Sequence, residues 1–247
     1  MIKSIEKMTQ ILNLFSIDRP KLLIKEIQEE LKMPKSTVFR ILDTLEQTNF
    51  IQRNEATHEY SLGFQLFRLG SVYQMNLDYR RIALPHMREL MEETKETVEL
   101  NILDGSNRIC IEKIDSPLDV RNFVRVGERK PAYLGASGKV MLAFLPEEEL
   151  EIILKSVEEL NIISISELKR ELQEIRVTGY AITQGERILG TYSIAAPILG
   201  VQGQLIAGIN LAGPLQRLTE ERVALLKARC MQTASKISQL MGYTVLE

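Results

Sequence analysis

The side chains best arranged for chemistry lie on a predicted helix that runs from Pro34 to about Gln47. Its apolar face carries Val38, Ile41, Leu42 and Leu45, and the opposite stripe carries Ser36, Arg40, Asp43 and Gln47, with Thr37 and Thr44 at its margin. Short hydroxyl side chains let a helix approach phosphate closely, and an arginine can fork to guanine or to phosphate. Lys35 is the only charge between Pro34 and Phe39, so the local field is positive. This division favours hydrogen bonding to the base edges and phosphates of a nucleic acid.

The candidate contacts to nucleic acid also include an aromatic residue and a residue of a predicted hairpin. We expect Phe39 to pack under that hairpin, and the alternative is contact with a thymine methyl group. Arg53 lies in the hairpin together with His58, where a solvated hairpin tip would show the same residues. The full set of candidate contacts is Lys35, Ser36, Thr37, Phe39, Arg40, Thr44 and Arg53.

The elements that position this helix follow the order helix, helix, tight turn, helix, hairpin. Apolar residues at helical spacing predict helices over residues 4–15 and 22–32. Pro34 fits the first position of the third helix, where a missing N–H costs nothing. Strands are predicted at 50–53 and 59–62. This order is typical of a winged helix-turn-helix, whereas each helix alone would also fit a generic three-helix bundle with a solvated polar face.

The remainder of the chain is predicted to fold as an α+β domain. A helical pattern over 63–77 predicts a linker helix, and a second helix follows at 79–96, with Pro85 near its first turns. Strands are then predicted at 97–103, 108–115, 120–126, 179–183, 190–199 and 204–212, and helices at 135–144, 146–156, 166–177 and 219–241. Such a pattern predicts one antiparallel sheet flanked by helices. We expect domains at 1–62 and 78–247, joined by the linker helix.

Composition limits the classes of protein to which this chain can belong. Its 247 residues, 45% hydrophobic and 26% charged, suffice for one large domain or two of ordinary size. No apolar stretch approaches the roughly 18–20 residues that span a bilayer, and the first residues lack a signal-peptide core. We therefore expect a cytoplasmic protein with no membrane partner. The net charge is −2, and residues 1–62 hold nine basic and nine acidic residues, so any DNA contact depends on local placement of charge.

Catalytic and metal chemistry find little support in the sequence. Cys110 and Cys230 lie far apart, and neither has a cysteine or histidine at metal-ligand spacing. The histidines are His58 and His86, and neither lies near a motif suited to a Ser-His-Asp triad. We predict no catalytic residue, no metal site and no cofactor.

The segment Gly135–Lys139 shares features with a phosphate-binding loop but does not match one. Such a loop needs Gly-x-x-x-x-Gly-Lys-Ser/Thr, whereas here Tyr133 occupies the first glycine position and Val140 replaces the Ser/Thr. Nucleotide hydrolysis is therefore rejected. The segment instead predicts a tight helix start whose backbone N–H groups face a pocket, which suits a small carboxylate.

Several segments resemble one known family. Pro34-Lys35-Ser36-Thr37-Val38-Phe39-Arg40-Ile41-Leu42 resembles the recognition helix of IclR-family bacterial transcription regulators. Gly135-Ala136-Ser137-Gly138-Lys139-Val140-Met141-Leu142-Ala143 resembles the effector-domain motif of that family, as do Gly179-Tyr180-Ala181, Gly185-Glu186 and Ile194-Ala195-Ala196-Pro197-Ile198. Residues 207–214 look like the closing strand and turn. These matches occur in the order of the family, from the first helix to the last.

The resemblance implies that residues 78–247 form a GAF-like effector-binding and oligomerisation domain. It also implies homodimers, often paired into tetramers, that bind palindromic promoter sites in double-stranded DNA, with dimer contacts from the linker helix. Carried over residue by residue, the effector site comprises Leu134, Gly135, Ala136, Ser137, Thr183, Glu186, Ser193, Asn210 and Ala212. Thr183 stands where many relatives have aspartate, and Ser193 where some have cysteine. Both departures bear on the identity of the ligand.

For some of these residues, a purely structural role without a ligand is an alternative. Gly138 also fits a geometric role at the helix start, and Glu186 fits a solvated carboxylate or a salt-bridge partner. Asn210 is harder to explain this way, because a buried amide in an apolar strand must find partners. The sequence favours a DNA-binding transcription regulator controlled by a small-molecule effector, a small organic acid. The alternatives are an enzyme that acts on a small metabolite and a protein-interaction module that does not bind DNA.

Overall fold

The computed structural model describes residues 2–16, 18–75 and 78–244. The chain divides into two compact units, Met1–Leu77 and Asp78–Glu247, and each unit is described by itself. The sequence-based domain limits also include residues 1, 17, 76–77 and 245–247, which lie outside the described residues.

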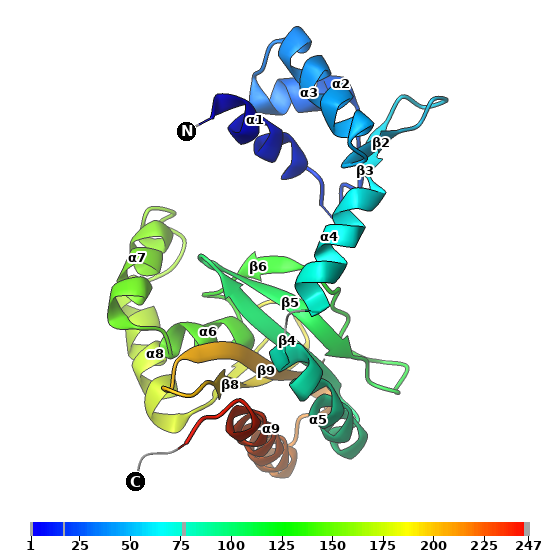
Figure 1. Ribbon diagram of the computed structural model, residues 1–247. Coiled ribbons are helices and arrows are strands. Elements are labelled where there is room, and N and C mark those ends of the chain that lie inside the picture. The colour runs from blue at the N-terminus through cyan, green and yellow to red at the C-terminus, as the bar shows by residue number, and fades with distance from the viewer. Residues whose placement is uncertain (1, 17, 76–77, 245–247) are drawn as a thin grey trace. The chain divides into compact units, whose positions relative to one another are not determined.

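The first unit combines helices with a small sheet (Figure 1). Its elements are α1 (Lys3–Leu12), β1 (Lys21–Leu22), α2 (Ile24–Leu31), α3 (Lys35–Gln47), β2 (Ile51–Arg53), β3 (Tyr60–Leu62) and α4 (Phe64–Met75). The strands form an antiparallel sheet in the order β1-β3-β2. The core contains the apolar faces that the sequence predicts, with Ile11 from α1, Ile27 from α2 and Leu42 from α3 all buried. The predicted order of helices followed by a hairpin is confirmed.

Two details of this unit differ from the sequence prediction. Pro34 lies one residue before α3, with φ −58° and ψ 140°, and not at its first helical position. Its backbone is extended, as is usual for the residue that precedes a helix, while its carbonyl accepts from the N–H of Val38 at 3.1 Å. Strand β1 was not predicted, because two residues are too few to show an alternating pattern.

The second unit is built on one antiparallel sheet. Its elements are α5 (Asp78–Thr94), β4 (Thr97–Asp104), β5 (Asn107–Ile114), β6 (Arg129–Pro131), α6 (Ala136–Ala143), α7 (Glu147–Glu158), α8 (Ile165–Thr178), β7 (Ala181–Gln184), β8 (Thr191–Leu199), β9 (Leu205–Pro214), the 3₁₀ turn η1 (Leu215–Arg217) and α9 (Glu220–Leu240). The strand order is β6-β5-β4-β9-β8-β7. The α+β fold predicted from the sequence is confirmed.

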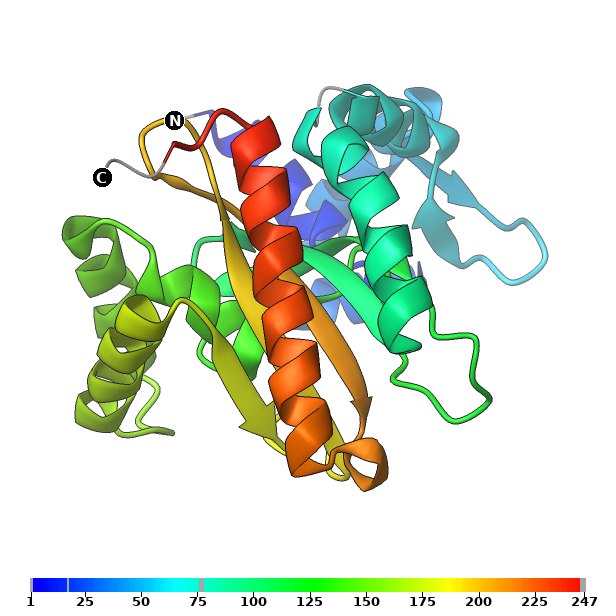
Figure 2. The same cartoon turned by 90° about the horizontal axis from the view of Figure 1, so that it is seen from below.

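The two faces of this sheet differ in character. Helices α5 and α9 lie side by side across one face (Figure 2), where Leu100 of β4 and Ile209 of β9 are buried in an apolar core. Successive residues of a strand point to opposite faces. The polar residues that alternate with this core therefore point to the other face, against which α6 packs. Helix α6 in turn packs against α8.

The strand predicted at 120–126 is wrong. This segment is not a strand in the structure, whereas β6, which was not predicted, pairs with β5. Side chains take the place of a strand ladder here, since the carbonyl of Asn122 accepts from Thr97 Oγ1 and that of Val120 accepts from Arg217. Pro85 lies within α5, about two turns from its start, which agrees with its predicted position near the first turns of the helix.

Candidate DNA-binding surface and effector site

Helix α3 presents its polar stripe on the surface of the first unit. Lys35, Ser36 and Arg40 are exposed, and Thr37 is half-buried. Within the described residues, the Arg40 guanidinium has no ion pair or hydrogen bond. The first turn of α3 holds no acid, and Pro34 gives no side-chain cap. A helix N-terminus carries partial positive charge, so this end of α3 is suited to phosphate.

The other sequence candidates on this surface are partly engaged. Thr44 Oγ1 donates to the carbonyl of Arg40 at 2.9 Å, so its hydroxyl can still accept but its proton is used. Arg53 of β2 lies over the ring of Tyr60, and its Nη2 is 2.9 Å from Nδ1 of His58. The expectation that Phe39 packs under the hairpin is wrong, because its side chain is 54% exposed and lies outside the core of the unit.

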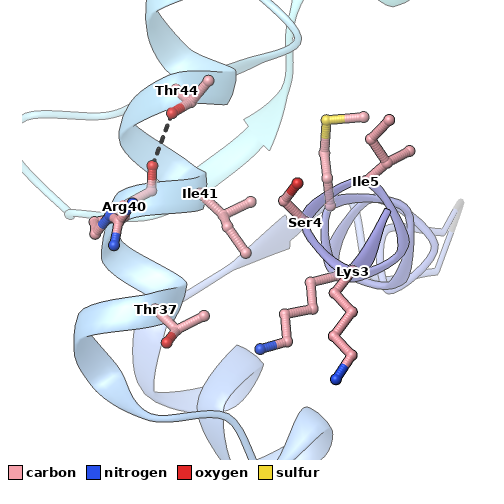
Figure 3. A pocket seen from close by; sticks show the side chains of 9 residues that line it. Lys3, Ser4, Ile5, Thr37, Arg40, Ile41 and Thr44 are labelled. Atoms are coloured by element: carbon pink, nitrogen blue, oxygen red, sulfur yellow. Dashed lines mark hydrogen bonds between the residues drawn. The ribbon is translucent and has the colours of Figure 1, made fainter. Parts of the chain in front are cut away.

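A groove of about 500 Å³ separates α1 from α3. It is lined by Lys3, Ser4, Ile5, Lys7, Met8, Thr37, Arg40, Ile41 and Thr44, three of which are cations and none of which is an acid. Figure 3 shows Ile41 directed from α3 toward α1, with Lys3 on the opposite wall. Lys3 and Lys7 were not predicted from the sequence as part of this surface, although their spacing of four residues places them on one helical face. The groove widens the basic surface beyond α3.

In the second unit, the residues that the resemblance assigns to the effector site gather at the start of α6. Leu134, Gly135, Ser137, Thr183, Glu186 and Ser193 line one small cavity. Gly135 has a φ of +80°, a conformation that favours glycine, where the chain turns into α6. Ser193 lies opposite Ala212 in the strand register, and its hydroxyl donates to Asn210 Oδ1 at 2.5 Å.

The backbone N–H groups at the start of α6 are already paired, which corrects the expectation of an open anion site. The N–H of Gly135 donates to Glu186 Oε2 at 3.1 Å, and the N–H of Ala136 donates to Thr183 Oγ1 at 3.1 Å. A carboxylate of the chain itself thus lies where a ligand carboxylate was expected. The cavity measures only about 10 Å³, which is room for about one water molecule. A ligand must therefore displace protein groups to enter.

The geometry decides between the alternative roles of Glu186 and Gly138. Glu186 is a salt-bridge partner as well as a cap, since its carboxylate lies 2.9 Å from Nζ of the buried Lys139. Glu171 of α8 contacts the same ammonium at 2.9 Å. Gly138 is required by packing, because a Cβ there would lie 2.1 Å from the carbonyl oxygen of Ala132.

A set of buried polar residues on the α6 face of the sheet was not predicted from the sequence. Glu99, Asn101 and Arg108 are fully buried there, and Asn122 is nearly so. Glu99 contacts three neighbours: Asn122 Nδ2 donates to its Oε1 at 3.1 Å, and Arg187 and Arg108 lie 3.6 and 3.8 Å from its carboxylate. The sequence does contain an indication of them, because polar and apolar residues alternate in the segment Thr97-Val98-Glu99-Leu100-Asn101-Ile102. Asn122 and Arg187 also line the cavity at α6.

The chemistry of the two cysteines argues against thiol catalysis. Both Cys110 and Cys230 are buried. Burial raises the pKa of each thiol to about 12, so both stay protonated near neutral pH. Among the described residues, no group of three or more His, Cys, Asp or Glu side chains could hold a metal ion. No helix within the described part of the chain is long and apolar enough to cross a membrane.

A helix-turn-helix unit with an open basic face, followed by an α+β unit with a buried polar site, defines the class of helix-turn-helix transcription regulators. Comparison with known proteins identifies the family. Residues 4–55 match the IclR helix-turn-helix domain, and residues 72–239 match the C-terminal domain of the bacterial transcriptional regulator IclR. This chain belongs to the IclR family, and it is therefore a DNA-binding transcription regulator and not an enzyme.

Individual relatives support this assignment over nearly the whole chain. The HTH-type transcriptional regulator KipR of Bacillus subtilis is 37% identical over 98% of both chains. The regulator KdgR of Escherichia coli is 37% identical over 89% of this chain and 86% of its own. The crystal structure of an IclR transcriptional regulator from Alicyclobacillus acidocaldarius is 28% identical, with a TM-score of 0.83, and covers 98% of this chain and 100% of its own.

Proposed function

We propose that this chain binds promoter DNA through residues 1–62 and that a small organic acid, bound within residues 78–247, controls this binding. The observation that carries the proposal is the buried polar face of the sheet at the start of α6. Burial of polar groups costs free energy unless they are paired, so a face of this kind is favoured where it recognises a ligand. The candidate residues at the start of α6 lie at the edge of this face.

An acid suits this site because donors predominate around it. The N-terminus of α6 carries partial positive charge, and Lys139 and Arg187 lie close by. Glu186 already demonstrates that a carboxylate fits, since it accepts the N–H of Gly135. An IclR homolog from Microbacterium hydrocarbonoxydans has been solved in complex with 4-hydroxybenzoate, so an acid ligand is compatible with this fold.

The DNA contacts of the proposal come from the exposed stripe of α3 and the hairpin. We assign base contacts to Arg40 and to Ser36 at the N-terminal end of the helix, and phosphate contacts to Lys35 and Arg53. Thr37, Phe39 and Thr44 border this stripe. Relatives named transcriptional repressors, such as AllR of Escherichia coli at 30% identity, favour a repressing role for this chain.

A palindromic site requires two copies of the chain, and the linker helix offers a surface for pairing. Phe64 and Phe67 of α4 are 72% and 69% exposed, and their ring centroids lie 5.7 Å apart. Large exposed aromatic residues of this kind mark protein–protein contacts. We therefore propose a homodimer, itself able to pair, whose two copies of α3 meet half-sites about 34 Å apart on the DNA.

The proposal is tested by gel-shift titration of the DNA upstream of the gene at two salt concentrations. Wild-type protein is expected to bind, and Arg40→Ala is expected to lose specific affinity by about 1–3 kcal/mol while its thermal unfolding stays unchanged. Lys25→Ala is the control, because Lys25 is an exposed lysine of α2 outside this surface. Equal binding by wild type and Arg40→Ala would contradict the assignment of α3. A panel of carboxylates then tests whether an acid changes the DNA affinity.

A further inference from the structure

Arg108 of β5 has unused hydrogen-bonding capacity in the interior. Its side chain is fully buried, and its Nη1 donates to Asn101 Oδ1 at 2.7 Å. Within the part of the chain that the structure describes, its Nε and Nη2 have no hydrogen-bond partner. These two N–H groups point the same way from one edge of the guanidinium, which is the edge that binds a carboxylate through two parallel hydrogen bonds. Arg108 therefore presents two unpaired N–H groups along an edge of the kind that binds a carboxylate.

The charges around Arg108 do not balance. Glu99 is a single carboxylate between two guanidinium groups, and its distances of 3.8 Å to Arg108 and 3.6 Å to Arg187 are both longer than hydrogen bonds. The group of three carries a net charge of +1; its Glu99 and Arg108 side chains are fully buried, and Arg187 is 18% exposed. A buried charge without a full partner is unfavourable, so this cluster favours an additional anion.

Two amides add to the unpaired donors. Asn101 Nδ2 and Asn210 Nδ2 are buried and, like the two nitrogens of Arg108, have no partner among the described residues. Register and alternation place Glu99, Asn101 and Asn210 on the α6 face of neighbouring strands, since Glu99 lies opposite Asn210. In this group of side chains, unpaired donors thus outnumber the one unpaired acceptor, Glu99 Oε2.

This cluster is continuous with the proposed effector site. Asn122 and Arg187 both contact Glu99, and both line the small cavity at the start of α6. Ser193 lines the same cavity and donates to Asn210. A ligand bound at α6 therefore extends toward Arg187 and Glu99 when it is longer than a simple carboxylate group.

We infer that Arg108, Glu99, Arg187 and the two amides form a second subsite, which binds an oxygen-rich group at the far end of the effector. The inference rests on the proposed effector site and specifies its ligand: an acid with a second acceptor group, a carboxylate or hydroxyls, and not a monocarboxylate with an apolar tail. Hydroxyl and carboxylate oxygens both accept from these donors, and a carboxylate also balances the net charge.

Isothermal titration of the full-length protein with matched acids tests the inference. Glutarate and pentanoate have the same chain length and differ in the second carboxylate, while gluconate offers hydroxyls in its place. Glutarate or gluconate is expected to bind at least tenfold more tightly than pentanoate, and the tighter of the two shows whether the second group is charged. Equal affinity for all three acids would overturn the second subsite and leave the proposed acid site standing. No binding of any of them would count against both.

Variants of the arginines separate recognition from folding. Arg187 also lines the cavity at α6, so Arg187→Gln is expected to weaken both acids, and to reduce the affinity for the tighter acid at least tenfold more than that for pentanoate. Arg129→Gln is the matched control, since Arg129 is an exposed arginine of β6 that pairs with Asp104. If Arg187→Gln weakens both acids equally, or weakens neither, the subsite is refuted. For Arg108→Gln, the same ratio of affinities is measured when thermal unfolding shows that the variant is folded. When it is not folded, Arg187→Gln alone decides the question.

Discussion

Glu186 occupies the place at the start of α6 that an acid ligand would need, so removing it should have opposite effects on stability and affinity. In Glu186→Ala, the N–H of Gly135 loses its carboxylate acceptor and Lys139 loses one of its two carboxylate partners. The ligand-free protein should therefore become less stable. A ligand carboxylate should bind more tightly, because it no longer competes with a tethered one.

The size of both effects follows from the same interaction. Hydrogen bonds to charged groups contribute about 1.5–3 kcal/mol, and the Glu186 side chain is 31% exposed, which places it at the low end, about 1.5 kcal/mol. A loss of about 1.5 kcal/mol lowers the Tm by about 3–6 °C in a domain of this size. The same free energy no longer opposes ligand entry, which corresponds to a Kd about tenfold lower.

Thermal unfolding and isothermal titration with the best-binding acid of the carboxylate panel measure the two effects. Glu171→Ala is the matched control, because Glu171 contacts Lys139 at the same distance of 2.9 Å, whereas the described N–H groups at the start of α6 bond to Glu186 and Thr183. It should lower the Tm without changing the affinity. If Glu186→Ala lowers both stability and affinity, Glu186 is part of the ligand site and not its competitor, and the reasoning is refuted.

Three further predictions concern charge in other parts of the chain. Lys3→Ala should reduce the slope of log affinity for DNA against log salt by about 1, measured beside Lys25→Ala, which should leave the slope unchanged. Glu96→Ala should lower the unfolding free energy by about 3 kcal/mol in urea titration, because this fully buried carboxylate holds two arginines; a loss below 1 kcal/mol would contradict a structural role. The raised pKa values of Cys110 and Cys230, about 12, predict that stability falls above about pH 9, as the unfolded chain loses thiol protons that the folded chain keeps. The slope should be about 1.4 kcal/mol per pH unit for each thiol, and the double alanine variant should lack it.

The fold could be predicted from the sequence wherever a strong local pattern coincided with tertiary packing. The helical spacing of Ile27 and Leu42 identified the faces that meet in the core of the first unit. The sheet of the second unit was predicted from alternation on β4 and β9, whose apolar halves pack under α5 and α9. The segment around Phe123 shows the limit, because it has strand-like residues but its carbonyls bind side chains distant in sequence.

The candidate effector site was only half predictable for a related reason. The resemblance pointed to the start of α6, but the partners of its N–H groups come from Thr183 and Glu186, 47 and 51 residues further along the chain, and no local pattern shows that they are bonded. The polar residues Glu99 and Arg108 were missed because an alternating strand usually turns its polar face to water. Here α6 covers that face, and the sequence of the strand does not show that a helix packs against it.

Both candidate sites lie at the positive N-terminus of a helix, and they differ in whether a group of the protein already binds there. Helices α3 and α6 both begin without an acid in the first turn and without a side-chain cap from the preceding residue. At α3 the positive end lies on the surface beside Lys35, so an anion can bind directly and salt should compete with it. At α6 the positive end is already bound by Glu186, so an anion can enter only by exchange. In the proposed effector site, such an exchange would give two arrangements of the chain, with Glu186 bound or released, and a regulator needs two states that its effector binds with different affinity.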